Sequence, residues 1–135
     1  MPKARVLLVT KSEEGTERFV TSAQMQEEDG ARAFAFEEGG AHYIMRTGAP
    51  ARVTRKGDIA YELVLDPVRE MPVIIHTSYG EIEAVVRVLR FREERSDREI
   101  NIEADYSLFF SGEEHKHKIK FSARFERDGG KGDIE

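Results

Sequence analysis

The stretch from Pro72 to Phe91 carries apolar side chains at every second position, on both sides of a break at Tyr79 and Gly80. A two-residue period places alternate side chains on one face of a β-strand, whereas an α-helix has a period of about 3.6 residues. Gly80 suits the break because glycine adopts the positive φ angles of tight turns at little cost. The stretch therefore predicts two antiparallel strands whose shared face holds Val73, Ile75, Thr77, Tyr79, Ile82, Ala84, Val86 and Val88.

A second alternating stretch fills the last third of the chain and predicts another hairpin. Its two halves, residues 100–110 and 117–125, place mostly isoleucine, leucine and aromatic side chains at every second position. A turn over residues 111–114 connects them. With that turn, Ala104 lies opposite Phe121, so that a small residue meets a large one on the inner face.

Two shorter hairpins are expected in the middle of the chain. A Gly-Gly pair predicts a two-residue loop that sets Phe36 opposite Tyr43. Further along, a three-residue loop with its glycine in a left-handed conformation sets Val53 opposite Tyr61, whereas a two-residue loop would set Tyr61 opposite Arg52. We expect the three-residue loop.

The N-terminal third is less regular. Residues 5–10 include four consecutive apolar side chains and predict a short strand that is buried on both faces. Residues 17–26 fit either a strand or a helix that would form a lid over the mouth of a barrel. The β-branched residues Val20 and Thr21 favour the strand.

Eight to ten strands with short antiparallel connections and one continuous apolar face predict an all-β protein, an up-and-down β-barrel. A β-sandwich is the alternative. Closure is favoured because every strand has a sequence neighbour to pair with, which leaves only the first and last strands to seal the edge. A length of 135 residues suits a single domain. We expect this domain to span residues 1–127, followed by a flexible tail at 128–135.

Composition excludes several classes of protein. Cysteine is absent, so disulfide frameworks, thiolate nucleophiles and cysteine-based zinc sites are ruled out. The formal charge of −5 argues against a nonspecific nucleic-acid-binding protein, which presents a net cationic surface to phosphates. The first apolar run is too short for a signal peptide or a membrane-spanning helix, so we expect a cytosolic protein with no membrane partner.

Four motifs of the chain resemble the YwiB-like family, a group of small bacterial cytosolic proteins of uncharacterised function. They are Val53-Thr54-Arg55-Lys56-Gly57, the strand at 59–65, Thr77-Ser78-Tyr79-Gly80, and Ala104-Asp105-Tyr106-Ser107-Leu108. Where the family tends to carry an aromatic residue two positions before the threonine of the third motif, this chain has Ile75. The resemblance implies a lipocalin-like calycin barrel, whose wider group often holds apolar ligands, and it provides no catalytic assignment.

Six side chains on the expected inward faces form a candidate ligand site. They are Tyr43, Arg55, Tyr61, Thr77, Tyr79 and Tyr106. An apolar cavity with a few hydroxyls and one guanidinium suits a small apolar or amphipathic molecule, with Arg55 pairing a carboxylate head group. The alternative is a filled barrel, in which the tyrosine rings pack in the core and their hydroxyls reach backbone groups or the rim. Arg55 borders a turn, so its guanidinium can equally reach solvent.

Catalytic and metal sites are not expected. His115 and His117 share a strand face at a spacing that metal sites use, yet no third ligand fits beside them and the surrounding lysines disfavour a dication. The sequence has no nucleophile elbow and no phosphate-binding glycine loop, and its paired glutamates fall in or beside expected turns. We therefore expect a protein that is not an enzyme and that needs no cofactor or metal.

Two outward-facing features concern partners. An apolar set on the outer face indicates a homodimer or a docking scaffold and consists of Val85, Leu89, Phe91 and Phe109. Arginines at 87–98 and lysines at 116–120 form two cationic stripes that could contact RNA or an acidic protein. Acidic residues interleave with these stripes or lie beside them, so cross-strand ion pairs account for much of both and nucleic-acid binding is not expected.

Overall fold

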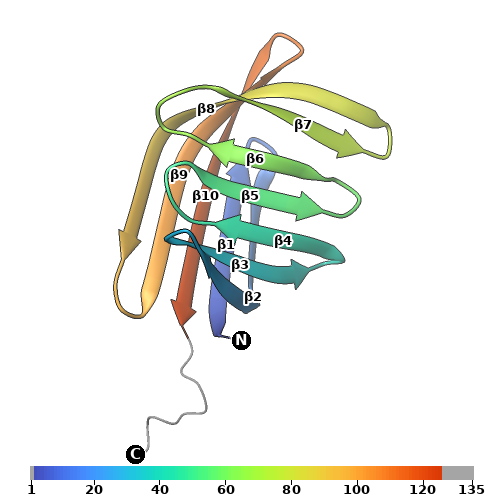
Figure 1. Ribbon diagram of the computed structural model, residues 1–135. Helices are drawn as coiled ribbons and strands as arrows, with labels where there is room; N and C mark the ends of the chain where they lie inside the picture. Colours follow the sequence, from blue (N-terminus) through green and yellow to red (C-terminus); the bar gives the residue numbers. More distant parts are fainter. Residues whose placement is uncertain (1, 126–135) are drawn as a thin grey trace, which may run out of the picture.

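The computed structural model describes residues 2–125, which form ten antiparallel β-strands in a nearly closed barrel (Figure 1). The strands are β1 (Lys3–Ser12), β2 (Gly15–Glu28), β3 (Ala31–Glu38), β4 (Ala41–Arg46), β5 (Ala51–Lys56), β6 (Tyr61–Leu65), β7 (Met71–Thr77), β8 (Gly80–Arg95), β9 (Glu99–Phe110) and β10 (Glu113–Phe125). The predicted all-β barrel is confirmed, and residues 17–26 lie in a strand. The expected tail at 128–135 lies outside the described residues. In the described part of the chain, no helix is long and apolar enough to cross a membrane.

Each strand pairs with its neighbours in sequence, except that β6 and β7 do not pair with each other, and β1 also pairs with β10. The sheet therefore ends in two edge strands, β6 and β7. These edges meet at one isolated bridge, in which the backbone amide of Ala60 donates to the carbonyl of His76 at 3.0 Å and the amide of His76 donates back at 2.8 Å. Backbone hydrogen bonds are thus sparser at this seam than in the ladders on either side.

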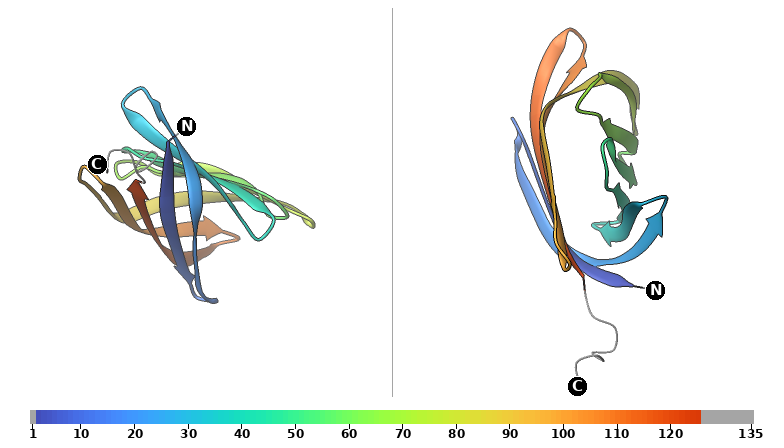
Figure 2. Two further views of the ribbon diagram at one scale, coloured as in Figure 1. Left: turned by 90° about the horizontal axis from the view of Figure 1, so that it is seen from below. Right: turned by 60° about the vertical axis from the view of Figure 1, so that its left-hand side comes forward.

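Long strands build one wall of the barrel and short strands the other (Figure 2). The inward side chains of the two walls meet in the core, because alternation puts every second residue inside. Phe34 of β3 is fully buried, and its ring centroid lies 5.4 Å from that of Phe121 in β10. Phe36 lies opposite Tyr43, as predicted.

The two ends of the barrel differ. At one end, the loop between β4 and β5 begins with a buried residue: Thr47 is 1% exposed, and its Oγ1 accepts a hydrogen bond from the amide of Arg32 at 3.1 Å. The amide of Gly48 donates to Oε1 of Glu93 in β8 at 3.1 Å. These bonds tie the loop to strands on both sides and close this end. At the opposite end the hairpins β1–β2, β3–β4, β7–β8 and β9–β10 make their turns.

The register between β5 and β6 corrects the sequence prediction. Tyr61 lies opposite Arg55, not opposite Val53. The connecting loop is longer than expected because the Arg55 guanidinium donates hydrogen bonds to the carboxylate of Asp58 and the carbonyl of Ile59 within it. The register shift keeps Tyr61 on the inner face and places it beside the arginine.

The β9–β10 turn is tighter than predicted. Ser111 and Gly112 alone form it, with φ angles of 54° and 74°. Ala104 therefore lies opposite Ile119 and not opposite Phe121. A shift of two residues leaves each side chain on its original face, so the predicted inside and outside of this hairpin are correct.

A β-bulge in β8 changes which residues face outward. The ladder to β9 skips Leu89, which has no partner across the strands. An extra residue shifts the alternation by one position, so Phe91 turns inward and packs against the core. The predicted outer apolar set therefore loses Phe91; Val85 and Leu89 are exposed, and Phe109 is half-buried.

Candidate functional site

Two adjoining cavities open at the end of the barrel that the β4–β5 loop does not close. The inner cavity has a volume of about 240 Å³ and the outer one about 490 Å³. They adjoin because they share five lining residues, namely Thr10, Glu17, Tyr61, Leu63 and Tyr106. We call this pair of cavities the barrel mouth. Its presence means that the barrel is hollow at this end.

Three neighbouring strands place three polar side chains in a row in the barrel mouth. Cross-strand register sets Tyr43 of β4 beside Arg55 of β5, and Arg55 beside Tyr61 of β6. Residues directly opposite on antiparallel strands have Cβ atoms about 5 Å apart, so two local hairpins suffice to build the row. Tyr106 of β9 lines the same two cavities as Tyr61 and comes from the long-stranded wall.

Arg55 is fixed by its neighbours. Its Nε donates to the hydroxyl of Tyr43 at 3.1 Å, and its Nη1 donates to Oδ1 of Asp58 at 3.2 Å and to the carbonyl of Ile59. The guanidinium carbon lies 5.6 Å from the Tyr43 ring centroid, within cation–π range. Burial acts to lower the pKa of Arg55, but the hydrogen bonds with Tyr43 and Asp58 outweigh it and raise that pKa. Within residues 2–125, its Nη2 makes no hydrogen bond, so this nitrogen can donate to a ligand.

Tyr61 and Tyr106 contribute hydroxyl groups that have no hydrogen-bond partner in the described part of the chain. Burial raises the pKa of Tyr61 to about 12 and also raises the pKa of Tyr106, which is 8% exposed. Both phenols therefore stay protonated at neutral pH. A protonated phenol donates one hydrogen bond, so each hydroxyl can serve an acceptor in the barrel mouth.

The rest of the barrel mouth combines apolar walls with a polar rim. The apolar residues of the inner cavity are Leu8, Phe19, Val53, Ile59, Leu63 and Ile119. Glu17 of β2 lines both cavities and is exposed. His117 lines the outer cavity with its ring stacked on Tyr106, at 5.3 Å between centroids, and burial lowers its pKa. A ligand in the barrel mouth would therefore contact apolar side chains in the inner cavity and hydrogen-bonding groups nearer the rim.

The structure brings together four of the six predicted site residues, namely Tyr43, Arg55, Tyr61 and Tyr106. The inward placement of Tyr79 is wrong, because this residue lies in the β7–β8 turn and is 99% exposed. Thr77 is half-buried on the same face of β7 as Val73 and Ile75, but it lines neither cavity of the barrel mouth: its Oγ1 donates to the carbonyl of Gly80 at 2.8 Å and accepts from the amide of Tyr79 at 3.1 Å. The alternation of inward and outward side chains ends with β7 at Thr77, so it does not predict the orientation of Tyr79 in the turn.

Sequence reasoning missed the residues that β1, β2 and β10 contribute to the barrel mouth. These are Thr10, Glu17, Phe19 and His117. A firm strand assignment for residues 17–26 would have placed Glu17 and Phe19 on one face. Their approach to β5 and β6 depends on which residues of distant strands meet once the barrel closes, and the alternating pattern of a single strand does not specify this.

His115 makes contacts at the tips of two hairpins. Its Nδ1 lies 3.6 Å from Oε1 of Glu13, its Nε2 lies 3.5 Å from Oε1 of Glu113, and its ring stacks on Phe110 at 4.3 Å. Across residues 2–125, no three histidine, aspartate or glutamate side chains are arranged to hold a metal ion.

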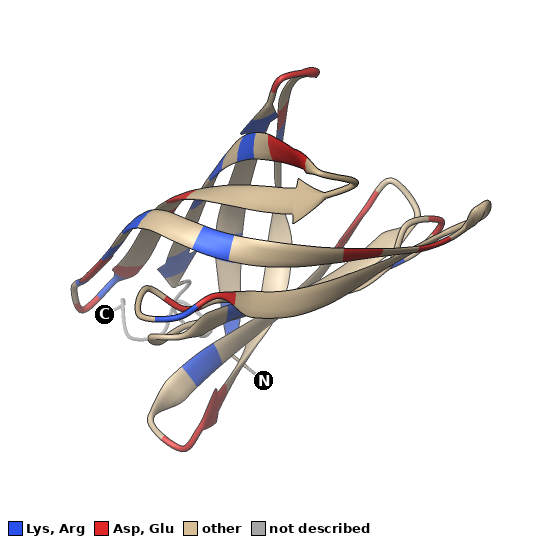
Figure 3. Cartoon of the chain, turned by 90° about the horizontal axis from the view of Figure 1, so that it is seen from above, with Lys and Arg blue, Asp and Glu red and all other residues tan. Residues whose placement is uncertain are grey.

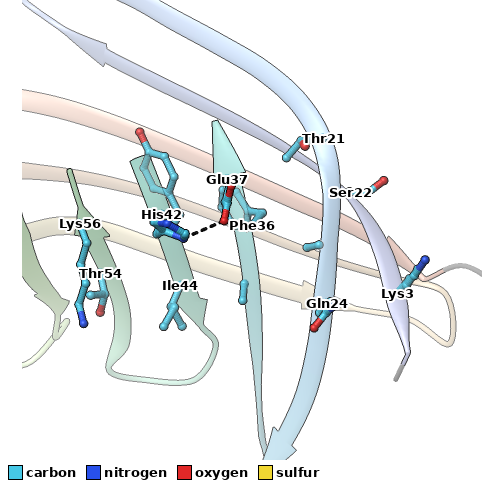
Figure 4. Close-up of a pocket in the computed structure, with 13 residues that line it drawn as sticks. Lys3, Thr21, Ser22, Gln24, Phe36, Glu37, His42, Ile44, Thr54 and Lys56 are labelled. Carbon is cyan, nitrogen blue, oxygen red and sulfur yellow. Dashed lines mark ion pairs between the residues drawn. The ribbon is translucent and has the colours of Figure 1, made fainter. Parts of the chain in front are cut away.

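A third hollow, of about 690 Å³, lies where β2 and β3 separate beyond Gln24 (Figure 4). Its charged groups do not converge. Lys3 and Lys56 lie on opposite sides of it, and Nδ1 of His42 is 3.0 Å from Oε2 of Glu37. The barrel mouth is the stronger candidate because its polar groups meet around one space.

Comparisons with known proteins identify a fold and a family. A family described as "Domain of unknown function (DUF1934)" matches residues 8–121. The chain is similar to a solved structure, the crystal structure of ywiB protein from Bacillus subtilis, with a TM-score of 0.72 and 13% sequence identity over 93% of this chain and 92% of that chain. No curated protein matches this chain. These findings confirm the YwiB-like resemblance that the four motifs predicted.

Proposed function

The chain belongs to the DUF1934 family of domains of unknown function, and from the geometry of the barrel mouth we propose that it binds a small amphipathic anion. The head group of this ligand is a carboxylate or a similar compact oxyanion and lies against Arg55, Tyr61 and Tyr106. Its apolar part lies on the inner wall. The protein binds this ligand and does not transform it.

The single observation that carries the proposal is the arrangement around Arg55. A permanent cation is held in position, with one nitrogen free to donate, next to two neutral hydroxyls that have no partner among the described residues. Hydrogen bonds from a guanidinium to an oxyanion are short and about twice as strong as neutral ones. Three donors around one space favour an acceptor with several oxygen atoms.

The dimensions of the barrel mouth support a small ligand. Pockets for drug-sized ligands measure about 300–1,000 Å³, and the inner cavity, at about 240 Å³, lies just below this range. Its walls at Leu8, Val53, Leu63 and Ile119 suit a short alkyl chain or a single ring, which gains free energy by leaving water.

The raised tyrosine pKa values support binding without catalysis. A general base works best when its pKa lies near the working pH, whereas the pKa of Tyr61 is about 12. The chain also has no cysteine to serve as a nucleophile. The same absence of cysteine fits the cytosolic location that we propose for this binding function.

Calorimetric titration with sodium octanoate tests the proposal, with 1-octanol as the uncharged analogue. We expect one site per chain for octanoate and weaker binding of octanol, because octanol cannot pair with Arg55. The Arg55→Ala variant should bind octanoate at least about tenfold more weakly, the loss expected for one charge-assisted hydrogen bond.

Arg52→Ala provides the matched control. Arg52 lies on the same strand but faces outward, 3.6 Å from Glu62, with its side chain 48% exposed. Its removal should leave octanoate affinity unchanged. Equal affinity in wild type and Arg55→Ala, with both proteins folded by circular dichroism, would exclude the proposed head-group site.

A homodimer is the second candidate function. It is favoured by exposed apolar side chains on β7 and β8, which are Ile74, Val85 and Leu89. Native mass spectrometry distinguishes the two. A monomer that retains a small additional mass supports ligand binding, and a dimer without one supports the interface.

A further inference from the structure

A groove lined by cations crosses the outer face of β2, β1, β10, β9 and β8. It has a volume of about 470 Å³. Its charged lining residues are Lys11, Arg18, Arg90, Lys118, Lys120, Glu103 and Asp105. In Figure 3, blue bands mark lysine and arginine along several strands, whereas red marks many of the hairpin ends. This outer groove is therefore cationic in a chain whose formal net charge is −5.

Cross-strand register brings four of the cations together. Lys11 of β1 lies directly opposite Lys118 of β10. In the next outward-facing row, Val9 lies between Arg18 of β2 and Lys120 of β10. Like charges directly opposite each other destabilise a sheet. An anion bound over these rows would remove that repulsion.

Three of the groove cations make no ion pair with the described acidic residues, although Arg90 lies opposite Asp105 across the strands. In the part of the chain that the structure describes, no carboxylate oxygen lies within 4.0 Å of the side-chain nitrogens of Lys11, Arg18 or Arg90. Lys118 and Lys120 approach acidic residues of β9 only at 3.9 and 4.0 Å. Arginines elsewhere on the surface make closer pairs, at 2.7 Å for Arg46, 2.6 Å for Arg95 and 2.8 Å for Arg124. Lys11, Arg18 and Arg90 are thus available to an external anion, and the two lysines of β10 are held only by long ion pairs.

We propose that the outer groove is a second binding site, for a small molecule that carries two or more phosphate groups. Guanidinium groups match phosphate oxygens two at a time, and lysines add compact positive charge. The groove is large enough for a small polyphosphate. Among the described residues that line the groove, none has an aromatic side chain on which bases could stack. This favours phosphate recognition over the binding of single-stranded nucleic acid.

The outer groove can be tested separately from the barrel mouth. Arg18 and Lys120 line the groove and neither cavity of the mouth. Calorimetric titration of the full chain with inorganic triphosphate should show one site. The double variant Arg18→Gln/Lys120→Gln should weaken binding at least about tenfold, since it removes two charged donors. The same variant should bind octanoate as wild type does.

Arg5→Gln/Arg124→Gln is the control of equal charge change. These two residues lie opposite each other on the outer faces of β1 and β10, outside the groove. Triphosphate affinity should be unchanged in this control. Equal weakening in both double variants would overturn the proposal, because binding would then follow net charge alone. Tighter binding of a ten-nucleotide oligothymidylate than of triphosphate would also overturn it, in favour of an extended polyanion.

Discussion

At the scale of single residues, the order around Arg55 matters as much as its charge. A free arginine side chain loses rotamer entropy when it binds an anion, at a cost of about 2 kcal/mol. Here Tyr43 and Asp58 already hold the guanidinium, at 3.1 and 3.2 Å. Binding therefore starts from an ordered side chain, and more of the interaction free energy appears as affinity.

The buried hydroxyl of Tyr61 predicts a loss of stability at high pH. Burial raises its pKa from 10.0 to about 12 in the folded protein, so between these values the unfolded chain releases a proton that the folded chain keeps. The free energy of unfolding should therefore fall by on the order of 2 kcal/mol from this residue as pH rises from 10 to 12. Urea unfolding of wild type and Tyr61→Phe at pH 8, 10 and 11 measures the contribution of Tyr61 to this pH dependence. The variant should lose less stability than wild type as the pH rises.

Tyr79→Phe is the control for that experiment, because Tyr79 is 99% exposed. Its removal should leave the alkaline loss of stability as in wild type. If Tyr61→Phe also behaved as wild type, the Tyr61 hydroxyl would not be buried in the barrel mouth.

At the scale of secondary-structure elements, alternation determined the faces and the turns determined the registers. The inner faces of β9 and β10 are as predicted, yet Ala104 meets Ile119 because the turn has two residues. A local pattern repeats every two residues, so it cannot distinguish registers that differ by two. Turn length depends on specific contacts instead, such as the hydrogen bonds from Arg55 to the β5–β6 loop.

Local patterns likewise predicted some residues of the candidate site and missed others. Tyr43, Arg55 and Tyr61 were predictable because consecutive hairpins place them in one row. Glu17 reaches the same cavity only through the pairing of β1 with β10, which closes the barrel over more than a hundred residues of chain. Tyr79 was misassigned because it continues the two-residue period of β7 although it lies in the turn before Gly80.

The bulge in β8 predicts an unusual tolerance to deletion. Deletion of Leu89 removes the unpaired residue, so Val88 and Phe91 keep their inward faces and the ladder becomes regular. The free energy of unfolding should fall by no more than about 1 kcal/mol. Deletion of Val86, which is 1% exposed, would reverse the inward and outward faces of all strand residues on one side of the deletion. The free energy of unfolding should then fall by more than about 4 kcal/mol.

Urea denaturation of the two deletion variants measures this difference. Comparable losses in both would mean that Leu89 has a structural role that its position in the bulge does not explain.

At the scale of the whole molecule, the barrel is closed at one end and hollow at the other. The β4–β5 loop, with buried Thr47 and hydrogen bonds to β3 and β8, closes the first end. The mouth at the second end combines a fixed cation, neutral hydroxyls and apolar walls. The outer groove lies across the long strands on the outside of the same wall that supplies Tyr106. The two proposed sites thus use opposite faces of one sheet.

The most direct test of the central claim is a methyl NMR experiment on the protein saturated with octanoate. We predict nuclear Overhauser effects from the octanoate chain to the methyl groups of Leu8, Val53, Leu63 and Ile119 inside the barrel mouth. Effects confined to the outer-face methyl groups of Val85 and Leu89, or unchanged mouth methyl signals at saturating octanoate, would contradict a ligand site in the barrel.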